Sequence, residues 1–196
     1  MSREGTEEIT MVKLDDPFTR VDLVMTTYRR DPSRHALFCE KLRSLAACTR
    51  VRSTLWLMDE GCGPELPDVR AILEGSAVEL GAVCVAGDRS GQAAQFNRGY
   101  ALVEDDVRQS LQHHRSFLVK LEDDFEFTDE WLRRMLSVWY AADFPDHNIA
   151  MLGGANGEGG RDVRINGERV RLTFHVAAGC MFAPLAIWRQ MLPVPN

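Results

Sequence analysis

The sequence predicts an α/β fold of three layers, in which a mainly parallel sheet lies between two layers of helices. Its 196 residues fit one domain, at most with a small appendage, and are enough for a three-layer core. Hydrophobic residues make up 45% and charged residues 27%, as in globular rather than disordered or coiled-coil proteins. Four short apolar runs alternate with four stretches of helical periodicity, which is the pattern of parallel strands joined by helices.

The first two strand–helix units lie in the N-terminal half. Residues 21–27 form an apolar, β-branched run typical of a buried strand. Asp31-Pro32 then predicts a helix start, with the aspartate as N-cap and the proline at the first helical position. A second strand is predicted over residues 53–58. The helix expected after it has an apolar face that runs from Val69 to Leu80.

The next two units complete the alternation. A third strand is predicted over residues 82–86, and residues 96–111 follow as a helix with one apolar stripe. A fourth strand, residues 117–121, leads into an acidic triplet. Thr128 is the predicted N-cap of the helix behind it, whose inner face includes Leu132 and Trp139.

The pattern changes after Ala142. Residues 149–152 are a candidate strand, and residues 163–174 alternate around Asn166-Gly167, the strongest short-range signal of a β-hairpin. The tail, residues 176–196, predicts a small strand and an amphipathic helix. We therefore expect a flexible N-terminal segment, residues 1–18, and a single domain over residues 19–196.

Charge and cysteine content exclude several classes of protein. The net charge of −6 argues against a general nucleic-acid-binding protein. Five cysteines without a C-x-x-C pair fit neither a zinc site nor a disulfide framework, so the cytoplasm is the expected compartment. The N-terminus has no apolar signal-peptide core, and no apolar run approaches the roughly 20 residues of a membrane span.

Each of the four predicted strands ends in a polar or glycine-rich cluster. In chain order these clusters are Thr26-Thr27-Tyr28, Asp59-Glu60-Gly61, Gly87-Asp88 and Glu122-Asp123-Asp124. Ligands of open parallel sheets bind at the carboxyl ends of the strands, so the four clusters predict one ligand-binding cleft. The chain has neither G-x-G-x-x-G after its first strand nor a P-loop, which disfavours a dinucleotide site and a Walker-type phosphate site.

The acidic triplet suggests a divalent cation. Carboxylates are hard oxygen ligands suited to Mn²⁺ or Mg²⁺, and such ions are commonly completed by substrate phosphates and water. Acidic triplets also occur on loops that merely face solvent. Here the triplet lies between the apolar residues 118–121 and Phe125, so its carboxylates are held in place, and a cation would relieve their mutual repulsion.

The order of these motifs resembles the nucleotide-sugar-binding half of GT-A-fold glycosyltransferases, especially the large family 2 group. The likeness spans roughly Val21 to Trp188 and rests on Thr-Thr-Tyr, Met58-Asp59-Glu60-Gly61-Cys62, the segment of residues 90–99 and Leu121-Glu122-Asp123-Asp124-Phe125. It implies that residues 19–128 bind the donor and residues 129–196 the acceptor. It also implies an inverting, metal-dependent transfer of a sugar from a nucleoside diphosphate sugar to an acceptor hydroxyl.

The resemblance assigns roles residue by residue. Thr26, Thr27 and Tyr28 would lie near the base and ribose, and Asp59 with Glu60 would bind the base or ribose. Asn97 matches the asparagine of the helix after the third strand. Asp124 would be the direct metal ligand, with Glu122 on the ribose or metal and Asp123 part of the same D-x-D position. Gly179-Cys180-Met181 resembles the stretch that lines the acceptor side.

The catalytic base is where the sequence departs from the family. Family members place it in a Glu-Asp pair downstream of the Gly179 segment, and no such pair occurs before Asn196. Either the base lies elsewhere, or the chain is a natural minimal version, or it is truncated or degenerate. Glu158, Asp162 and His175 are the candidates present, because a carboxylate or histidine can accept the acceptor's proton. Glu158 and Asp162 equally fit a solvated loop, and His175 fits a structural histidine.

Three functions remain open after this comparison. The first is an active metal-dependent glycosyltransferase. The second is a sugar-nucleotide-binding or scaffold domain without activity, which the missing downstream pair favours. The third is a nucleotidyltransferase, which the absence of glycine in Thr26-Thr27-Tyr28-Arg29-Arg30 disfavours. The acceptor is not specified by any pattern in the chain.

Overall fold

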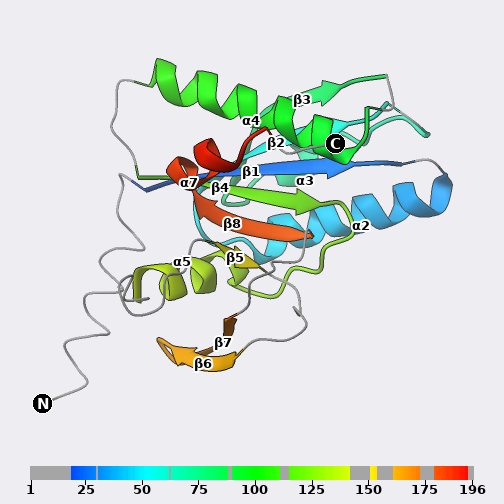
Figure 1. Cartoon of the computed structure of the whole chain (residues 1–196). Coiled ribbons are helices and arrows are strands. Elements are labelled where there is room, and N and C mark those ends of the chain that lie inside the picture. Colours follow the sequence, from blue (N-terminus) through cyan, green and yellow to red (C-terminus); the bar gives the residue numbers. More distant parts are fainter. Residues whose placement is uncertain are drawn as a thin grey trace, which may run out of the picture.

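The computed structural model describes residues 19–29, 31–61, 63–87, 90–110, 115–141, 151–153, 161–172 and 179–193. Strands and helices alternate along most of the chain (Figure 1). In order they are β1 (Thr19–Thr27), α2 (Pro32–Cys48), β2 (Ser53–Asp59), α3 (Val69–Leu73), β3 (Val78–Val85), α4 (Gln92–Gln109), β4 (Arg115–Glu122), α5 (Trp131–Ala141), β5 (Leu152–Gly153), β6 (Arg161–Ile165), β7 (Glu168–Leu172), β8 (Cys180–Pro184) and α7 (Leu185–Met191).

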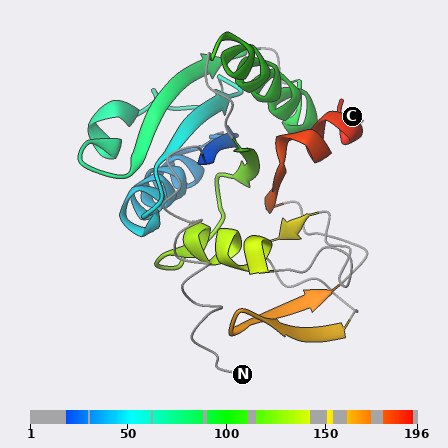
Figure 2. The same ribbon diagram turned by 90° about the vertical axis from the view of Figure 1, so that its left-hand side faces the viewer.

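The predicted three-layer α/β fold is confirmed. A six-stranded sheet has the order β3-β2-β1-β4-β8-β5, and β6 and β7 form a separate two-stranded sheet. The pairs β3–β2, β2–β1 and β1–β4 are parallel, whereas β8 is antiparallel to both β4 and β5. Helices α4 and α7 cover one face of the large sheet and α2 and α5 the other (Figures 1 and 2). The sheet is therefore mainly parallel and covered on both faces, as the alternation predicted.

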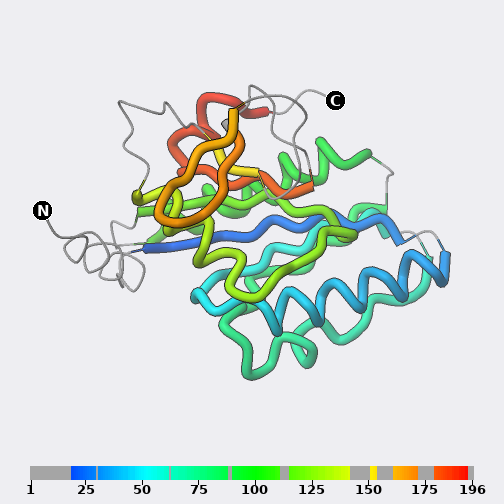
Figure 3. Tube along the Cα trace, turned by 90° about the horizontal axis from the view of Figure 1, so that it is seen from below, coloured from blue at the N-terminus to red at the C-terminus, as the bar shows by residue number. Residues whose placement is uncertain are grey.

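Alternating side chains of the central strand build the two cores. Leu23 and Met25 of β1 pack with residues of α2 and α5, whereas Val24 packs on the opposite face with Phe96 of α4 and Trp188 of α7. The Phe96 and Trp188 rings lie 5.1 Å apart between their centroids. Figure 3 shows β1 running through the middle of the sheet, with α2 and the β6–β7 hairpin on opposite sides of it in that view.

Helix α4 approaches the sheet closely at one glycine. A Cβ atom on Gly99 would come within 2.5 Å of Val24 Cγ1 and 3.1 Å of Met58 Cγ. Only glycine allows this contact, because real Cβ atoms do not approach so closely. The contact fixes the first half of α4, and with it the end of the helix that begins at the carboxyl edge of the sheet.

The helix predicted from Val69 to Leu80 is wrong in its second half. Helix α3 ends at Leu73, and Gly75 adopts a positive φ of 75°, so the chain turns there. β3 begins at Val78, four residues before the predicted strand start, and its side chains alternate between more buried and exposed. Leu80 shares a two-residue periodicity with the strand, which outweighs its helical spacing from Val69.

Two predicted helix starts have different outcomes. Asp31 caps α2 as expected, because its side chain accepts hydrogen bonds from the backbone N–H groups of Ser33 and Arg34. Thr128 does not cap α5. That helix begins at Trp131, after Glu130, which has a φ of 56°, and the Thr128 carbonyl accepts a 3.1 Å hydrogen bond from the Trp131 N–H.

The predicted hairpin around Asn166-Gly167 is confirmed. β6 pairs antiparallel with β7, and the two turn residues have φ values of 49° and 80°, as a two-residue hairpin turn of the I′ type requires. Of the candidate strand at 149–152, only its end coincides with β5, and residues 149–150 lie outside the described part. In the described part of the chain, no helix is long and apolar enough to cross a membrane.

Candidate functional site at the carboxyl edge of the sheet

The polar clusters of three neighbouring strands meet at one edge of the sheet. The parallel register pairs Thr27 with Asp59 across β1 and β2. On the other side of β1, Thr26 pairs with Glu122 of β4. The strand-end clusters that the sequence predicts to lie together are therefore neighbours in the sheet. The register does not show what these side chains bind.

Asp123 joins the ends of β1 and β4. Its Oδ2 accepts a 2.7 Å hydrogen bond from the Thr27 hydroxyl and a 3.0 Å bond from the Tyr28 N–H. Burial raises the pKa of this carboxyl, and the neighbouring Asp124 charge adds to the effect, against the Thr27 hydrogen bond and Arg34, which lower the pKa. With 6% of its surface exposed, Asp123 holds the two strand ends together rather than facing a ligand.

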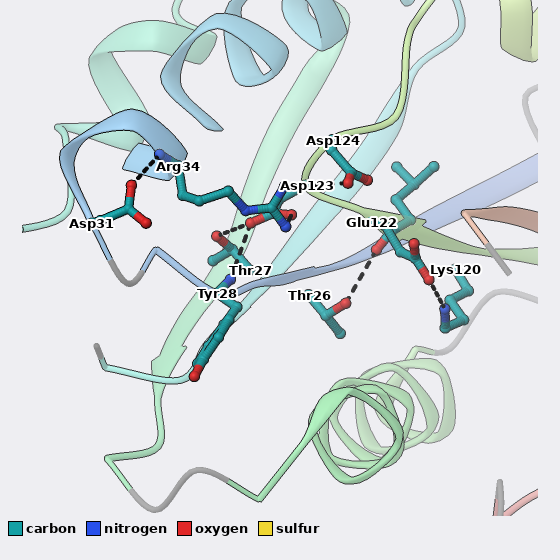
Figure 4. A network of polar contacts seen from close by, with 10 residues as sticks. Thr26, Thr27, Tyr28, Asp31, Arg34, Lys120, Glu122, Asp123 and Asp124 are labelled. Carbon is teal, nitrogen blue, oxygen red and sulfur yellow. Dashed lines mark hydrogen bonds and ion pairs between the residues drawn. The ribbon is translucent and has the colours of Figure 1, made fainter. Parts of the chain in front are cut away.

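Glu122, the last residue of β4, is more exposed than Asp123, which follows in the turn. Its Oε1 pairs with Lys120 Nζ at 3.1 Å, and its backbone N–H donates a 2.9 Å hydrogen bond to the Gly179 carbonyl. Lys120 is itself buried, so a cation fixed in the sheet anchors the Glu122 side chain (Figure 4). The Thr26 hydroxyl donates a weak 3.5 Å bond to the Leu121 carbonyl nearby.

Asp124 is the most exposed carboxylate of the triplet, with 45% of its side chain accessible. An arginine in the first turn of α2 reaches it: Arg34 NH1 lies 3.4 Å from Asp124 Oδ2, and its NH2 lies 3.7 Å from Asp123 Oδ1. The guanidinium thus stands where two carboxylates would attract a cation (Figure 4). Because the pair is partly exposed and its distances are long, it is a weak one.

Asp59 is held by a second arginine. Arg29 Nε and NH2 donate to the two Asp59 oxygens at 3.2 and 2.8 Å, and both side chains are almost fully buried. Arg29 also donates to the Pro64 carbonyl and lies over the Phe38 ring at 5.9 Å. Both oxygens of Asp59 are committed to this ion pair, so its role here is to fix the end of β2 against β1.

The remaining predicted binding residues lie around this edge. Tyr28 is partly buried and follows β1 directly, and the Glu60 N–H donates a 3.3 Å hydrogen bond to the Thr27 carbonyl. Asn97 is partly buried in the second turn of α4, a helix that begins at the same edge. Tyr28 contacts the acidic triplet through its backbone N–H, which donates to Asp123, whereas Glu60 follows β2 and Asn97 lies near the start of α4 at the same edge.

The donor set fits a divalent cation only with outside ligands. Glu122 and Asp124 offer hard oxygens, and Arg34 already occupies a cation position against Asp124. Among the described residues, however, no three His, Cys, Asp or Glu side chains are grouped so that they could hold an ion. An ion at this edge would therefore be held by the two carboxylates together with substrate phosphates and water, as Mg²⁺ commonly is.

Of the three candidate bases, only Asp162 belongs to the described residues; Glu158 and His175 lie outside them. Asp162 is on β6, where Arg169 donates to its Oδ2 at 2.6 Å and Arg171 to its Oδ1 at 2.9 Å. These bonds lower the pKa of Asp162 to about 2. A base works best with a pKa near the working pH, so this arrangement disfavours Asp162 in that role.

Sequence reasoning missed Lys120 and Arg34, and each leaves a signal. Lys120 is a charged residue inside the otherwise apolar run of residues 117–121, and a buried lysine needs a partner. Arg34 is a basic residue in the first turn of a helix, where the helix dipole favours acidic side chains. In both cases the local preference is broken, which is typical of functional sites.

The chain is similar to a solved structure of residues 1–349 of TarS from S. aureus. The two share 13% sequence identity with a TM-score of 0.49. The match covers 88% of this chain and 49% of that one, so the chain spans about half the length of the TarS structure. Neither a protein-family model nor a curated protein matches the sequence.

Proposed function

We propose that this chain is a glycosyltransferase that takes a sugar from a nucleoside diphosphate sugar. The observation that carries the proposal is the carboxyl edge of the sheet: Glu122, the last residue of β4, and Asp124, two residues further on, are both partly exposed there. Ligands of such sheets bind at this end. The resemblance of the strand-end motifs to family 2 glycosyltransferases supports the same assignment.

The residues at the edge divide the work. Glu122, positioned by Lys120, and Asp124 would hold Mn²⁺ or Mg²⁺, which as a Lewis acid stabilises charge on a leaving diphosphate. Asp123, Thr27 and the Arg29–Asp59 pair keep the ends of β1, β2 and β4 in register. Tyr28, Glu60 and Asn97 border the space in which a nucleotide would lie.

In the proposed transfer, the acceptor oxygen displaces the diphosphate from the anomeric carbon of the sugar. The acceptor oxygen forms a bond to the anomeric carbon of the sugar, and the bond from that carbon to the diphosphate oxygen breaks. The hydroxyl proton passes to a base, for which Glu158 and His175 remain the candidates because Asp162 is bound by two arginines. Inversion at the anomeric carbon is part of the proposal.

A sugar-nucleotide-binding domain without transfer activity is the second candidate. The observation that favours it is the pairing of Asp162. Among the described residues Asp162 is the one candidate base, and it forms ion pairs with Arg169 and Arg171. The two functions share the donor site and differ in whether the sugar is released from its nucleotide.

Titration of UDP-, GDP- and dTDP-sugars with and without Mn²⁺ tests both candidates, with binding measured by calorimetry and nucleotide release measured separately. We expect at least one nucleotide sugar to bind only when Mn²⁺ is present. Release over a panel of acceptors supports the transferase, and binding without release supports the second candidate. If no nucleotide sugar binds in the presence of Mn²⁺, both are wrong.

Asp124→Asn sharpens this test at one residue. Removing the most exposed carboxylate should weaken metal-dependent nucleotide binding at least about tenfold, because a charged ligand is lost. Asp129→Asn is the matched control, since Asp129 is also an exposed aspartate and pairs with the exposed Arg50 at 3.4 Å. Equal binding by the Asp124 and Asp129 variants would contradict the metal assignment.

A further inference from the structure

The two faces of the β6–β7 hairpin differ sharply in chemistry. Side chains alternate across a hairpin, and Ile165 is buried in the core while Val163 and Val170 pack against it. The opposite face consists of four charged residues: Asp162, Arg164, Arg169 and Arg171. We refer to these four residues as the arginine face.

Helix α5 fixes the orientation of this face. Arg134 of α5 donates to the two oxygens of Glu168 at 2.9 and 2.6 Å, and the Asn166 amide donates to the Ser137 hydroxyl. Both contacts involve residues of the turn or of the face toward the body. The hairpin is thus held to α5 from its inner side, and Figure 2 shows it on the side of α5 away from the large sheet. On the arginine face, 70% of the Arg169 side chain is accessible.

The charges of the arginine face work against the stability of the hairpin. Arg164 and Arg169 are directly opposite each other across the two strands, and like charges in that position are destabilising. Asp162 balances part of the charge through Arg169 and Arg171. The whole hairpin has four arginines and two acidic residues, in a chain whose net charge is −6. The hairpin is therefore a cationic region of an acidic protein. The repulsion between Arg164 and Arg169 makes this region locally less stable.

We propose that the arginine face binds the anionic groups of the acceptor, an acidic polysaccharide that carries carboxylate or phosphate groups. This inference rests on the proposed function and specifies its acceptor. The planar guanidinium matches carboxylate and phosphate oxygens with two parallel hydrogen bonds, so two opposed arginines suit one anionic group between them. The anionic group would offset the repulsion that the free hairpin bears.

The position of the hairpin suits this role. Leu172, the last residue of β7, and Gly179 are seven residues apart in the sequence, so their Cα atoms lie within about 25 Å of each other. The Gly179 carbonyl accepts the hydrogen bond from the Glu122 N–H at the proposed donor site. An extended polysaccharide bound on the arginine face is therefore within reach of that site.

The test uses the whole chain and polygalacturonate, a carboxylated polysaccharide, with neutral amylose as the comparison and without any nucleotide or metal. We expect wild type to bind polygalacturonate and not amylose. Arg164→Glu should weaken this binding at least about tenfold, because it reverses one of the two opposed charges. The same variant removes the Arg164–Arg169 like-charge contact but also the 3.1 Å hydrogen bond from Arg164 NH1 to the Gly167 carbonyl, so its melting temperature should stay within about 4 °C of wild type.

A loss of binding without a comparable loss of melting temperature separates a binding role from a structural one. Arg164→Gln, which removes the charge without reversing it, should weaken binding less than Arg164→Glu. Arg161→Gln is the matched control, since Arg161 belongs to the same strand but to the other face, and it should bind like wild type. Vesicles of phosphatidylglycerol and duplex DNA are run in parallel.

Several results would overturn the proposal. It fails if wild type does not bind polygalacturonate, if it binds amylose equally, or if Arg161→Gln weakens binding as much as Arg164→Glu. Tighter binding to vesicles or DNA than to the polysaccharide would replace it with a membrane or nucleic-acid surface. Because no nucleotide or Mn²⁺ is present, each of these failures is distinct from a failure of the donor site.

Discussion

Two aspartate–arginine contacts at the carboxyl edge, one at the end of β2 and one just after β4, differ in burial and in distance. At the end of β2, Arg29 and Asp59 are 3% and 1% exposed and form two hydrogen bonds. At the end of β4, Arg34 and Asp124 are 40% and 45% exposed, and their closest atoms are 3.4 Å apart. Both arginines belong to the segment that follows β1. This segment therefore supplies a buried partner to Asp59 at the end of β2 and an exposed partner to Asp124 after β4.

The difference shows which charges at this edge belong to the fold and which are available for exchange. A buried pair cannot release one member without leaving the other unsolvated, which makes it a structural element. An exposed pair is screened and contributes little, so a competing ion can replace it. We therefore assign Arg29–Asp59 to the scaffold, and we expect Arg34–Asp124 to be the pair that a ligand of the proposed donor site can displace.

The largest effect that would test this contrast is expected from Asp59→Ala. The substitution leaves the Arg29 guanidinium buried without its carboxylate, and should lower the free energy of unfolding by about 3–5 kcal/mol. Urea denaturation measures it. The double variant Arg29→Met with Asp59→Leu replaces the pair by apolar side chains and should recover most of the loss. If Asp59→Ala lowers the free energy of unfolding by less than about 1 kcal/mol, the Arg29–Asp59 pair contributes no more than an exposed ion pair does.

A smaller loss is expected from Asp123→Ala, which removes the link between β1 and β4. The Thr27 hydroxyl and the Tyr28 N–H lose their acceptor, and the free energy of unfolding should fall by about 2–3 kcal/mol. Thr27→Val, which removes only one of the two donors, should cost about 1 kcal/mol. If Asp123→Ala is as stable as the exposed control Asp129→Ala, Asp123 is not part of the scaffold.

The smallest effect is expected at the exposed Arg34–Asp124 pair, where the substitution should strengthen binding of Mn²⁺ and not weaken it. Arg34→Gln removes the cation that competes for Asp124, and should tighten Mn²⁺ binding about 2–5-fold, in line with the small energy of an exposed ion pair. Electron paramagnetic resonance of free Mn²⁺, with a bound nucleotide sugar present to complete the site, measures the affinity. Arg43→Gln, at an exposed position of the same helix, is the control and should leave it unchanged. Weaker Mn²⁺ binding by Arg34→Gln would show that Arg34 supports the ion instead of competing with it.

The sequence predicted the elements whose signals are local. The apolar runs ending at Thr27 and Leu121, the Asp31 cap and the Asn166-Gly167 turn each depend on neighbouring residues, and each is found where it was expected. The start of β3 was misplaced because Leu80 satisfies both a helical and a strand periodicity, and only pairing with β2 decides between them.

For the site, the sequence predicted which residues gather but not how they are engaged. Glu122, Asp123 and Asp124 are adjacent in the chain, yet Glu122 at the end of β4 pairs with Lys120, whereas Asp123 in the turn after it bonds to Thr27. The commitment of Asp59 to Arg29, and of Asp162 to Arg169 and Arg171, depends on partners brought together by folding. The charged residues of the sequence therefore predict where the site lies. Their burial and their partners in the folded chain decide which of them can bind a ligand.

The central place of β1 has a consequence for the order in which the protein assembles. β1 is hydrogen-bonded on one side to β2, the next strand in the chain, and on the other to β4; the Asp123–Thr27 bond that closes this second side spans 96 residues. During synthesis the β1–β2–β3 unit emerges first, with one edge of its most buried strand still unpaired. Contacts of such long sequence separation form slowly, and unpaired apolar strand edges attract other chains. The interval before β4 arrives is therefore when this protein is most exposed to aggregation, and Asp123 is among the last residues needed to end it.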